Sequence, residues 1–113
     1  MKAIVLRELG GPDKLQYEET EKPQAGPRDV VVRLKTAALN RRDVFITYGQ
    51  YPNVKLPAIP GSDGAGVVAE VGPDVDADWD GREVIVNPGL YWGNNPRVNA
   101  RTFSILGVPK NGT

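Results

Sequence analysis

Residues 61–72 read GSDGAGVVAEVG, and this glycine-spaced stretch decides how the rest of the chain is interpreted. Within it, residues 64–69 match the G-x-G-x-x-A spacing of a dinucleotide-binding turn. Such a turn needs a strand before it and a helix after it, with the nucleotide phosphates at the helix N-terminus. Pro57 and Pro60 precede the stretch and Gly72-Pro73 closes it, so neither element has room. The glycines therefore need a cause other than phosphate binding.

The composition indicates one small domain, residues 1–113, with a modest core, because 40% of the 113 residues are hydrophobic. Fourteen basic and fourteen acidic residues cancel without forming charged runs, so we expect neither nucleic-acid nor membrane binding. The chain contains no cysteine and no histidine, which removes thiolate and imidazole nucleophiles and every sulfur or imidazole metal ligand. With no disulfide and no apolar run long enough for a signal peptide or a membrane span, a cytoplasmic location is predicted.

Thirteen glycines and ten prolines divide the chain into short segments and predict a mainly β domain. β-branched and alternating apolar residues predict five strands, the first two forming a hairpin, at residues 2–9, 15–19, 29–39, 67–71 and 83–86. After Pro88 we expect an irregular loop with one apolar island at residues 103–106.

A short helix is predicted to begin at Asn40, whose side chain suits an N-cap, with Asp43 reaching back to the same turn. The helix should run to about Tyr48 and end at Gly49. The prolines between residues 51 and 60 then force an extended, irregular segment.

A second motif, residues 76–81 with the sequence DADWDG, imitates the opening of a calcium-binding loop. The twelfth position of that loop should supply a bidentate glutamate and is Asn87 here, and the flanking segments do not read as helices. A solvated acidic turn before a strand is the better interpretation.

The pattern G61-x-D63-x-x-G66-x-V68-x-x-V71-G72 resembles the N-terminal, GroES-like catalytic domain of the medium-chain dehydrogenase/reductase superfamily, whose zinc-dependent members carry G-H-E-x-x-G-x-V-x-x-V-G. Three further stretches are similar in the same order: residues 1–5, residues 38–43 with 49–52, and residues 86–89. The resemblance implies a partly open, GroES-like β-barrel with short helices, here incomplete at its C-terminus.

The resemblance also allows the metal positions to be compared. Ser62 stands where the zinc branch has a histidine, Asn40 where it has its first cysteine, and only Asp63 remains a plausible carboxylate ligand. The four cysteines of the family's structural zinc site are absent from residues 89–106. We therefore expect a member of the zinc-free branch, with no metal at either site.

In that branch the resemblance implies hydride transfer between NADP or NAD and a small carbonyl, quinone, enone or alcohol. Asn40 would face the nicotinamide and the substrate, or would serve as the helix N-cap; one side chain can do both. Arg41 matches a position that contacts the cofactor pyrophosphate, with an exposed surface arginine as the alternative.

Three further side chains are candidates for the reaction: Tyr51, Ser62 and Asp63. Tyr51 could line the cleft as a donor or could simply pack, and Asp63 could face the cleft with Ser62 or satisfy N–H groups of its own glycine turn. Gly64 and Gly66 are expected to let the backbone turn tightly at the floor of the cleft. For Asp43 a capping role is favoured over catalysis.

The superfamily's Rossmann cofactor domain would follow this domain and does not fit into 113 residues, so the chain is expected to be a fragment that binds the cofactor weakly and is inactive alone. An exposed sheet edge predicts self-association into a homo-oligomer. The alternative from another functional class is a stand-alone GroES-like module that binds a protein and catalyses nothing.

Overall fold

The computed structural model describes residues 1–113 and is built almost entirely of short strands, so the prediction of a mainly β domain is confirmed. Its elements, in order, are β1 (Lys2–Leu6), the 3-10 helix η1 (Pro12–Lys14), β2 (Leu15–Glu19), β3 (Val30–Ala38), α1 (Arg41–Thr47), β4 (Asp63–Val71), the 3-10 helix η2 (Ala77–Trp79), β5 (Glu83–Ile85), β6 (Gly89–Leu90), β7 (Ser104–Leu106) and β8 (Pro109–Lys110). The α-helix has only seven residues, and no helix is long and apolar enough to cross a membrane.

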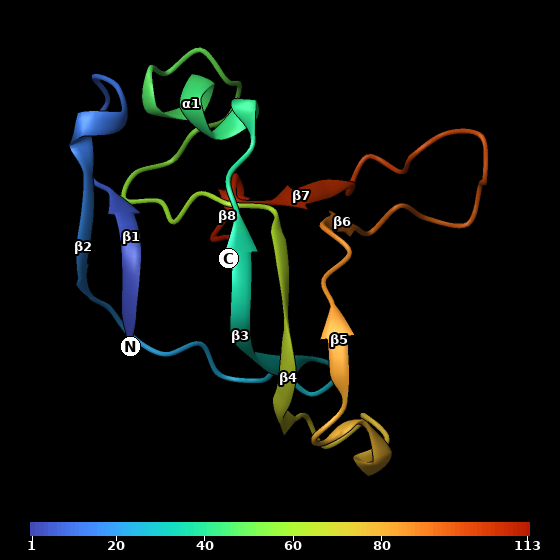
Figure 1. The fold of residues 1–113 in the computed structure, drawn as a ribbon. Coiled ribbons are helices and arrows are strands. Elements are labelled where there is room, and N and C mark those ends of the chain that lie inside the picture. Colours follow the sequence, from blue (N-terminus) through green and yellow to red (C-terminus); the bar gives the residue numbers. More distant parts are fainter.

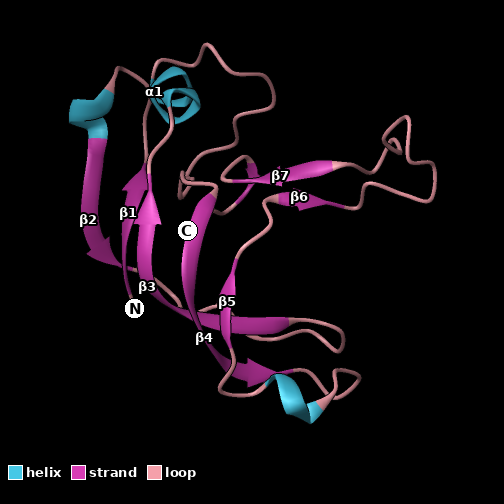
Figure 2. Cartoon of the chain, turned by 45° about the vertical axis from the view of Figure 1, so that its right-hand side comes forward, coloured by secondary structure: helices cyan, strands magenta, loops and turns pink.

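The strands form three small sheets (Figures 1 and 2). β1 and β2 make the predicted antiparallel hairpin, β3, β4 and β5 make a central antiparallel sheet, and β6, β7 and β8 make a third sheet in which β7 and β8 run parallel. In Figure 1, α1 lies above the sheets between the hairpin and β7. One isolated bridge, Leu6 to Ala58, ties the hairpin to the segment that leads into β4.

The glycine-spaced stretch, residues 61–72, contains the whole of β4, which begins at Asp63 and not at the predicted residue 67. Gly64 and Gly66 lie in extended strand opposite Ala37 and Leu34 of β3, so they do not form the expected tight turn. Only Gly61, with φ of 103°, has the left-handed backbone that favours glycine in a turn. The prediction failed because a glycine spacing alone does not distinguish a turn from close strand pairing.

A glycine is required at position 66 because the backbone of β3 lies too close for a side chain. A Cβ atom at Gly66 would lie 2.2 Å from the carbonyl oxygen of Arg33. The pairing of β3 with β4 shifts register between Leu34 and Thr36, beside this contact. A bulge of this kind bends the strand and brings the two backbones close together, which only glycine permits here.

The helix prediction is confirmed within one residue: Asn40 is the N-cap, α1 ends at Thr47, and Gly49 follows with φ of 71°. The Asp43 carboxylate accepts from the backbone N–H of Asn40 at 2.7 Å, as the capping prediction required. Ile46 and Thr47 turn inward from the helix and are buried.

The main apolar cluster joins three regions of the chain: Leu6 from β1, Ile46 from α1 and Val108 before β8. Leu15, Tyr51 and Val54 pack against it. Because Ile46 lies in the last turn of α1, burial of apolar surface in this cluster holds the C-terminal end of the helix in place.

The remaining differences from the sequence prediction concern the ends of strands. β1 ends at Leu6 and not at residue 9, and Leu9 is exposed. The apolar island in the irregular C-terminal part forms β7, which pairs with two strands of two residues each, β6 and β8. Such short pairings carry no periodic signal, so the sequence did not reveal them.

Candidate functional site

The start of α1 and the start of β4 are joined by three side-chain links, which we call the side-chain network. The Asn40 amide donates to Asp63 Oδ2 at 2.5 Å, Arg42 donates to Ser62 Oγ, and the Asp43 carboxylate accepts from the backbone N–H of Gly61 at 3.0 Å. Residues 40, 42 and 43 pair with residues 63, 62 and 61 in reverse order, so the two segments lie antiparallel.

Asp43 is the most deeply buried ionisable member of the network, with 4% of its surface exposed. Its two carboxylate oxygens are used separately, one by the N-terminus of α1 and the other by Gly61. A buried carboxylate is tolerated when backbone N–H groups satisfy it and a helix N-terminus faces it. Asp43 therefore fixes the helix to the turn before β4, which extends the predicted capping role to a second partner.

Arg42 connects a third segment to this pair. Its guanidinium donates to the carbonyl oxygens of Leu106 at 2.9 Å and of Val108 at 3.2 Å, on either side of the turn between β7 and β8. It also lies over the Tyr51 ring, 4.8 Å from the ring centre. α1, β4 and the β7–β8 turn are thus held by one side chain.

Glycines allow these segments to meet. A Cβ at Gly107 would lie 2.6 Å from the carbonyl oxygen of Gly61, and one at Gly112 would lie 1.9 Å from the same atom. The last residue, Thr113, donates from its hydroxyl to the carbonyl oxygen of Asp63 at 2.9 Å. The backbone at residues 61–63 is therefore enclosed by the C-terminal segment on one side and by α1 on the other.

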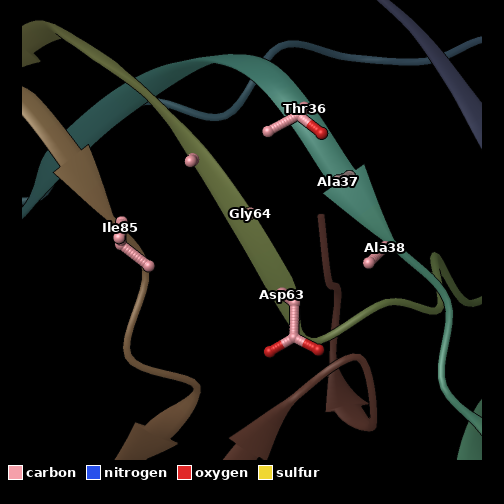
Figure 3. A pocket seen from close by; sticks show the side chains of 7 residues that line it. Thr36, Ala37, Ala38, Asp63, Gly64 and Ile85 are labelled. Atoms are coloured by element: carbon pink, nitrogen blue, oxygen red, sulfur yellow. The ribbon is translucent and has the colours of Figure 1, made fainter.

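An apolar depression of about 210 Å³ opens beside Asp63, between the ends of β3 and β4 and the edge strand β5 (Figure 3). Its lining includes Thr36, Ala37, Ala38, Asp63, Gly64 and Ile85. The Asp63 carboxylate is the one charged group in this lining, and Figure 3 shows it at one end of the depression. Ile85 is 86% exposed at the open side, so apolar surface faces solvent here.

The structure brings two of the predicted site residues together at the surface: Asn40 and Asp63, both exposed and hydrogen-bonded to each other. Ser62 is placed differently, with only 6% of its surface exposed. Its hydroxyl accepts from Arg42 and donates to the carbonyl oxygen of Leu106 at 2.9 Å, so its proton is already engaged. Tyr51 is half-buried, with its ring against the Arg42 guanidinium.

Arg41 is exposed and takes no part in the network. Its guanidinium lies 5.9 Å from the centre of the Phe45 ring and forms no ion pair. It is therefore free to bind an anionic group.

The donors at the site do not fit a zinc ion. No group of three His, Cys, Asp or Glu side chains is close enough together to hold a metal. Ser62, which the resemblance places at a metal-ligand position, is bonded to a guanidinium, whose positive charge opposes a divalent cation at the same place. Asn40 and Asp63 alone would leave a metal with one amide and one carboxylate.

The sequence predicted no role for Arg42, which lies within the stretch 38–43 that carries the resemblance. One signal was present: Ile46 follows Arg42 by four residues, so a helix must place both on one face. An apolar residue at that spacing indicates that the arginine lies partly under the surface. The acceptors at Leu106 and Val108 had no sequence signal, because they are backbone atoms of a distant turn.

Comparison with known proteins identifies the domain type. Residues 26–113 match the family model of the alcohol dehydrogenase GroES-like domain. A zinc-type alcohol dehydrogenase-like protein of Schizosaccharomyces pombe is 40% identical over 114 aligned residues, which cover 99% of this chain and 33% of that protein. A quinone oxidoreductase of Pseudomonas aeruginosa is 40% identical over 74 residues, covering 66% of this chain and 23% of that protein.

The fold is shared with a solved structure as well. The crystal structure of an NAD-dependent alcohol dehydrogenase superposes with a TM-score of 0.90 at 42% identity, over 100% of this chain and 35% of that one. The chain spans about a third of the length of these longer relatives.

Proposed function

Because the chain belongs to the alcohol dehydrogenase GroES-like domain family, we propose that it is the substrate-binding domain of an NAD- or NADP-dependent oxidoreductase that works without a metal. Its substrate class would be small carbonyl compounds, quinones or enones, or the corresponding alcohols. A second, dinucleotide-binding domain would complete the enzyme and would carry most of the cofactor contacts. A cytoplasmic location is proposed with it, on the absence of cysteine.

The observation that carries the proposal is the Asn40–Asp63 pair at one end of the apolar depression. Asp63 accepts from one N–H of the Asn40 amide, which leaves the second N–H free to donate. An apolar surface beside a fixed donor suits a substrate with a hydrocarbon part and a carbonyl oxygen.

The residues would act by orientation and electrostatics. When bound, a reduced nicotinamide supplies a hydride to the substrate. Hydride addition to a carbonyl carbon breaks the C=O π bond and leaves its electron pair on the oxygen; the Asn40 amide would stabilise this charge by donating its free N–H until a water molecule supplies the proton. Asp63 accepts from one N–H of the amide and leaves the other N–H directed to a ligand, and the apolar lining offers the hydrocarbon part of a substrate a surface to contact.

The relative named as zinc-type does not contradict this proposal, because its name describes that protein alone. Here the donor set disfavours a metal, and the Asn40 amide offers a hydrogen-bond donor beside the apolar depression. In this proposal the Asn40 amide, in place of a metal ion, polarises the carbonyl group of the substrate. Arg41 is proposed as a contact to the cofactor pyrophosphate.

The test uses the protein as it is translated from its gene, with its mass measured first. We expect a product longer than 113 residues that oxidises NADPH or NADH in the presence of a quinone, an enone or an aldehyde, at a rate unchanged by a metal chelator. Asn40→Ala should lower kcat by about 100-fold, as loss of one such donor does in other enzymes.

Two results would contradict the proposal. Activity that a chelator abolishes and zinc restores would show that a metal is required. A translated product of 113 residues that binds no nucleotide and turns over no substrate would favour the interaction-module alternative.

A further inference from the structure

Arg42 carries a positive charge that no acidic side chain neutralises. The ion pairs of the structure involve other residues. All three acceptors of the Arg42 guanidinium are neutral oxygens: Ser62 Oγ and the carbonyl oxygens of Leu106 and Val108. Its Nε–H is buried without a hydrogen-bond partner. Burying a charge without a counterion costs desolvation energy that an exposed arginine avoids. The arrangement therefore indicates that Arg42 fixes the positions of the groups it bonds.

The guanidinium suits such a role because its N–H groups project from a rigid plane in fixed directions. The acceptors belong to the start of β4 and to the β7–β8 turn, while Arg42 itself belongs to α1. The ring of Tyr51 lies against the plane and restricts its rotation. The relative positions of the three segments are therefore set by one group.

The exposed link between Asn40 and Asp63 cannot set this geometry itself. Both side chains are open to water, and hydrogen bonds at such positions compete with water and contribute little. The two interior links of the side-chain network, from Arg42 and Asp43, are shielded. The buried links from Arg42 and Asp43 therefore set the distance between Asn40 and Asp63.

We propose that Arg42 is a positioning residue of the candidate site. By bonding three neutral oxygens, it holds the start of α1 against the start of β4 and so presents the Asn40 amide and the Asp63 carboxylate side by side. The kinetic part of this inference rests on the proposed function; the structural part does not.

The test compares Arg42→Met and Arg42→Lys with Arg97→Met in the protein as translated from its gene. Arg97 is an exposed arginine whose side chain makes no hydrogen bond or ion pair. Nuclear magnetic resonance reports solvent exchange of the Asn40 side-chain amide, and steady-state kinetics report kcat and KM separately.

In both Arg42 variants, Asn40 amide exchange should accelerate by about twofold, the factor for losing an exposed hydrogen bond worth about 0.5 kcal/mol. Lysine should not rescue the site, because a single ammonium cannot reach three acceptors in fixed directions. kcat should fall on the order of 100-fold, as misplacement of reacting groups by about 1 Å does, with KM for the nucleotide little changed. Arg97→Met should match the unmodified protein in both measurements.

Unchanged amide exchange in folded Arg42→Met or Arg42→Lys protein would overturn the inference, and so would full rescue by lysine. If both variants fail to fold, Ser62→Ala removes one acceptor only, and unchanged exchange of the Asn40 amide there would count against it equally. Accelerated exchange in a protein without oxidoreductase activity would support the positioning role while refuting the proposed function, so the two failures are distinguishable.

Discussion

Replacing Gly66 with alanine should destabilise the central sheet, and the size of the effect follows from one contact. The added Cβ would lie 2.2 Å from the carbonyl oxygen of Arg33 and 2.9 Å from Leu34 Cα, both backbone atoms that cannot rotate away. β3 and β4 must separate for the methyl group to fit. Overpacking of this kind costs about 3 kcal/mol, from which about 0.5–1 kcal/mol is recovered because alanine restricts the unfolded chain.

A net loss of about 2 kcal/mol corresponds to a Tm lower by about 10 °C for a domain of this size. Circular dichroism during thermal unfolding measures it. Gly89→Ala is the matched control, since its nearest atoms lie at 3.5 and 3.6 Å and its φ is not positive, so we expect a change within about 0.5 kcal/mol. A Gly66→Ala protein that melts within about 2 °C of the unmodified chain would refute the close-approach explanation of this glycine.

Three further predictions concern other parts of the chain. Asp43→Asn should lower the free energy of unfolding by about 2 kcal/mol, because the buried amide cannot accept from both Asn40 and Gly61 as the carboxylate does; equal denaturation midpoints would contradict this. The Lys14 ammonium, bonded to Glu8 at 2.6 Å, holds the pKa of Glu8 below its usual range, so the pair stabilises the fold above the ordinary glutamate pKa and loses this contribution as the pH falls through the lowered value. Lys14→Met should therefore raise the pKa of Glu8 in a nuclear magnetic resonance titration. Elemental analysis of protein purified without chelator should find no stoichiometric zinc, and one zinc per chain would contradict the proposed metal-free site.

The elements with strong local signals were predicted well. The helix at residues 41–47 was found because a cap residue, an acidic third position and a terminal glycine agree with one another. The long β3 strand was found because β-branched residues precede an alternating pattern. In both cases the information lies within about ten neighbouring residues.

The failures share a physical cause, which is dependence on atoms far away in the chain. Gly64 and Gly66 were expected to form a turn, but Gly66 is constrained by the backbone of β3 and Gly64 by the side chains of Leu34 and Thr113, all far away in the chain. Ser62 was expected in the cleft, and its burial depends on Arg42 and on a carbonyl of the β7–β8 turn. The roles of Asn40, Arg41, Tyr51, Ser62 and Asp63 in a reaction stay predictions.

The side-chain network also has an evolutionary consequence. Its two halves lie about twenty residues apart, yet each interior link satisfies a polar group that would otherwise be buried without a partner. A change at one half alone carries a stability cost that a matching change at the other can remove. Among relatives, position 42 should therefore covary with position 62, so that the two motifs are inherited as one unit.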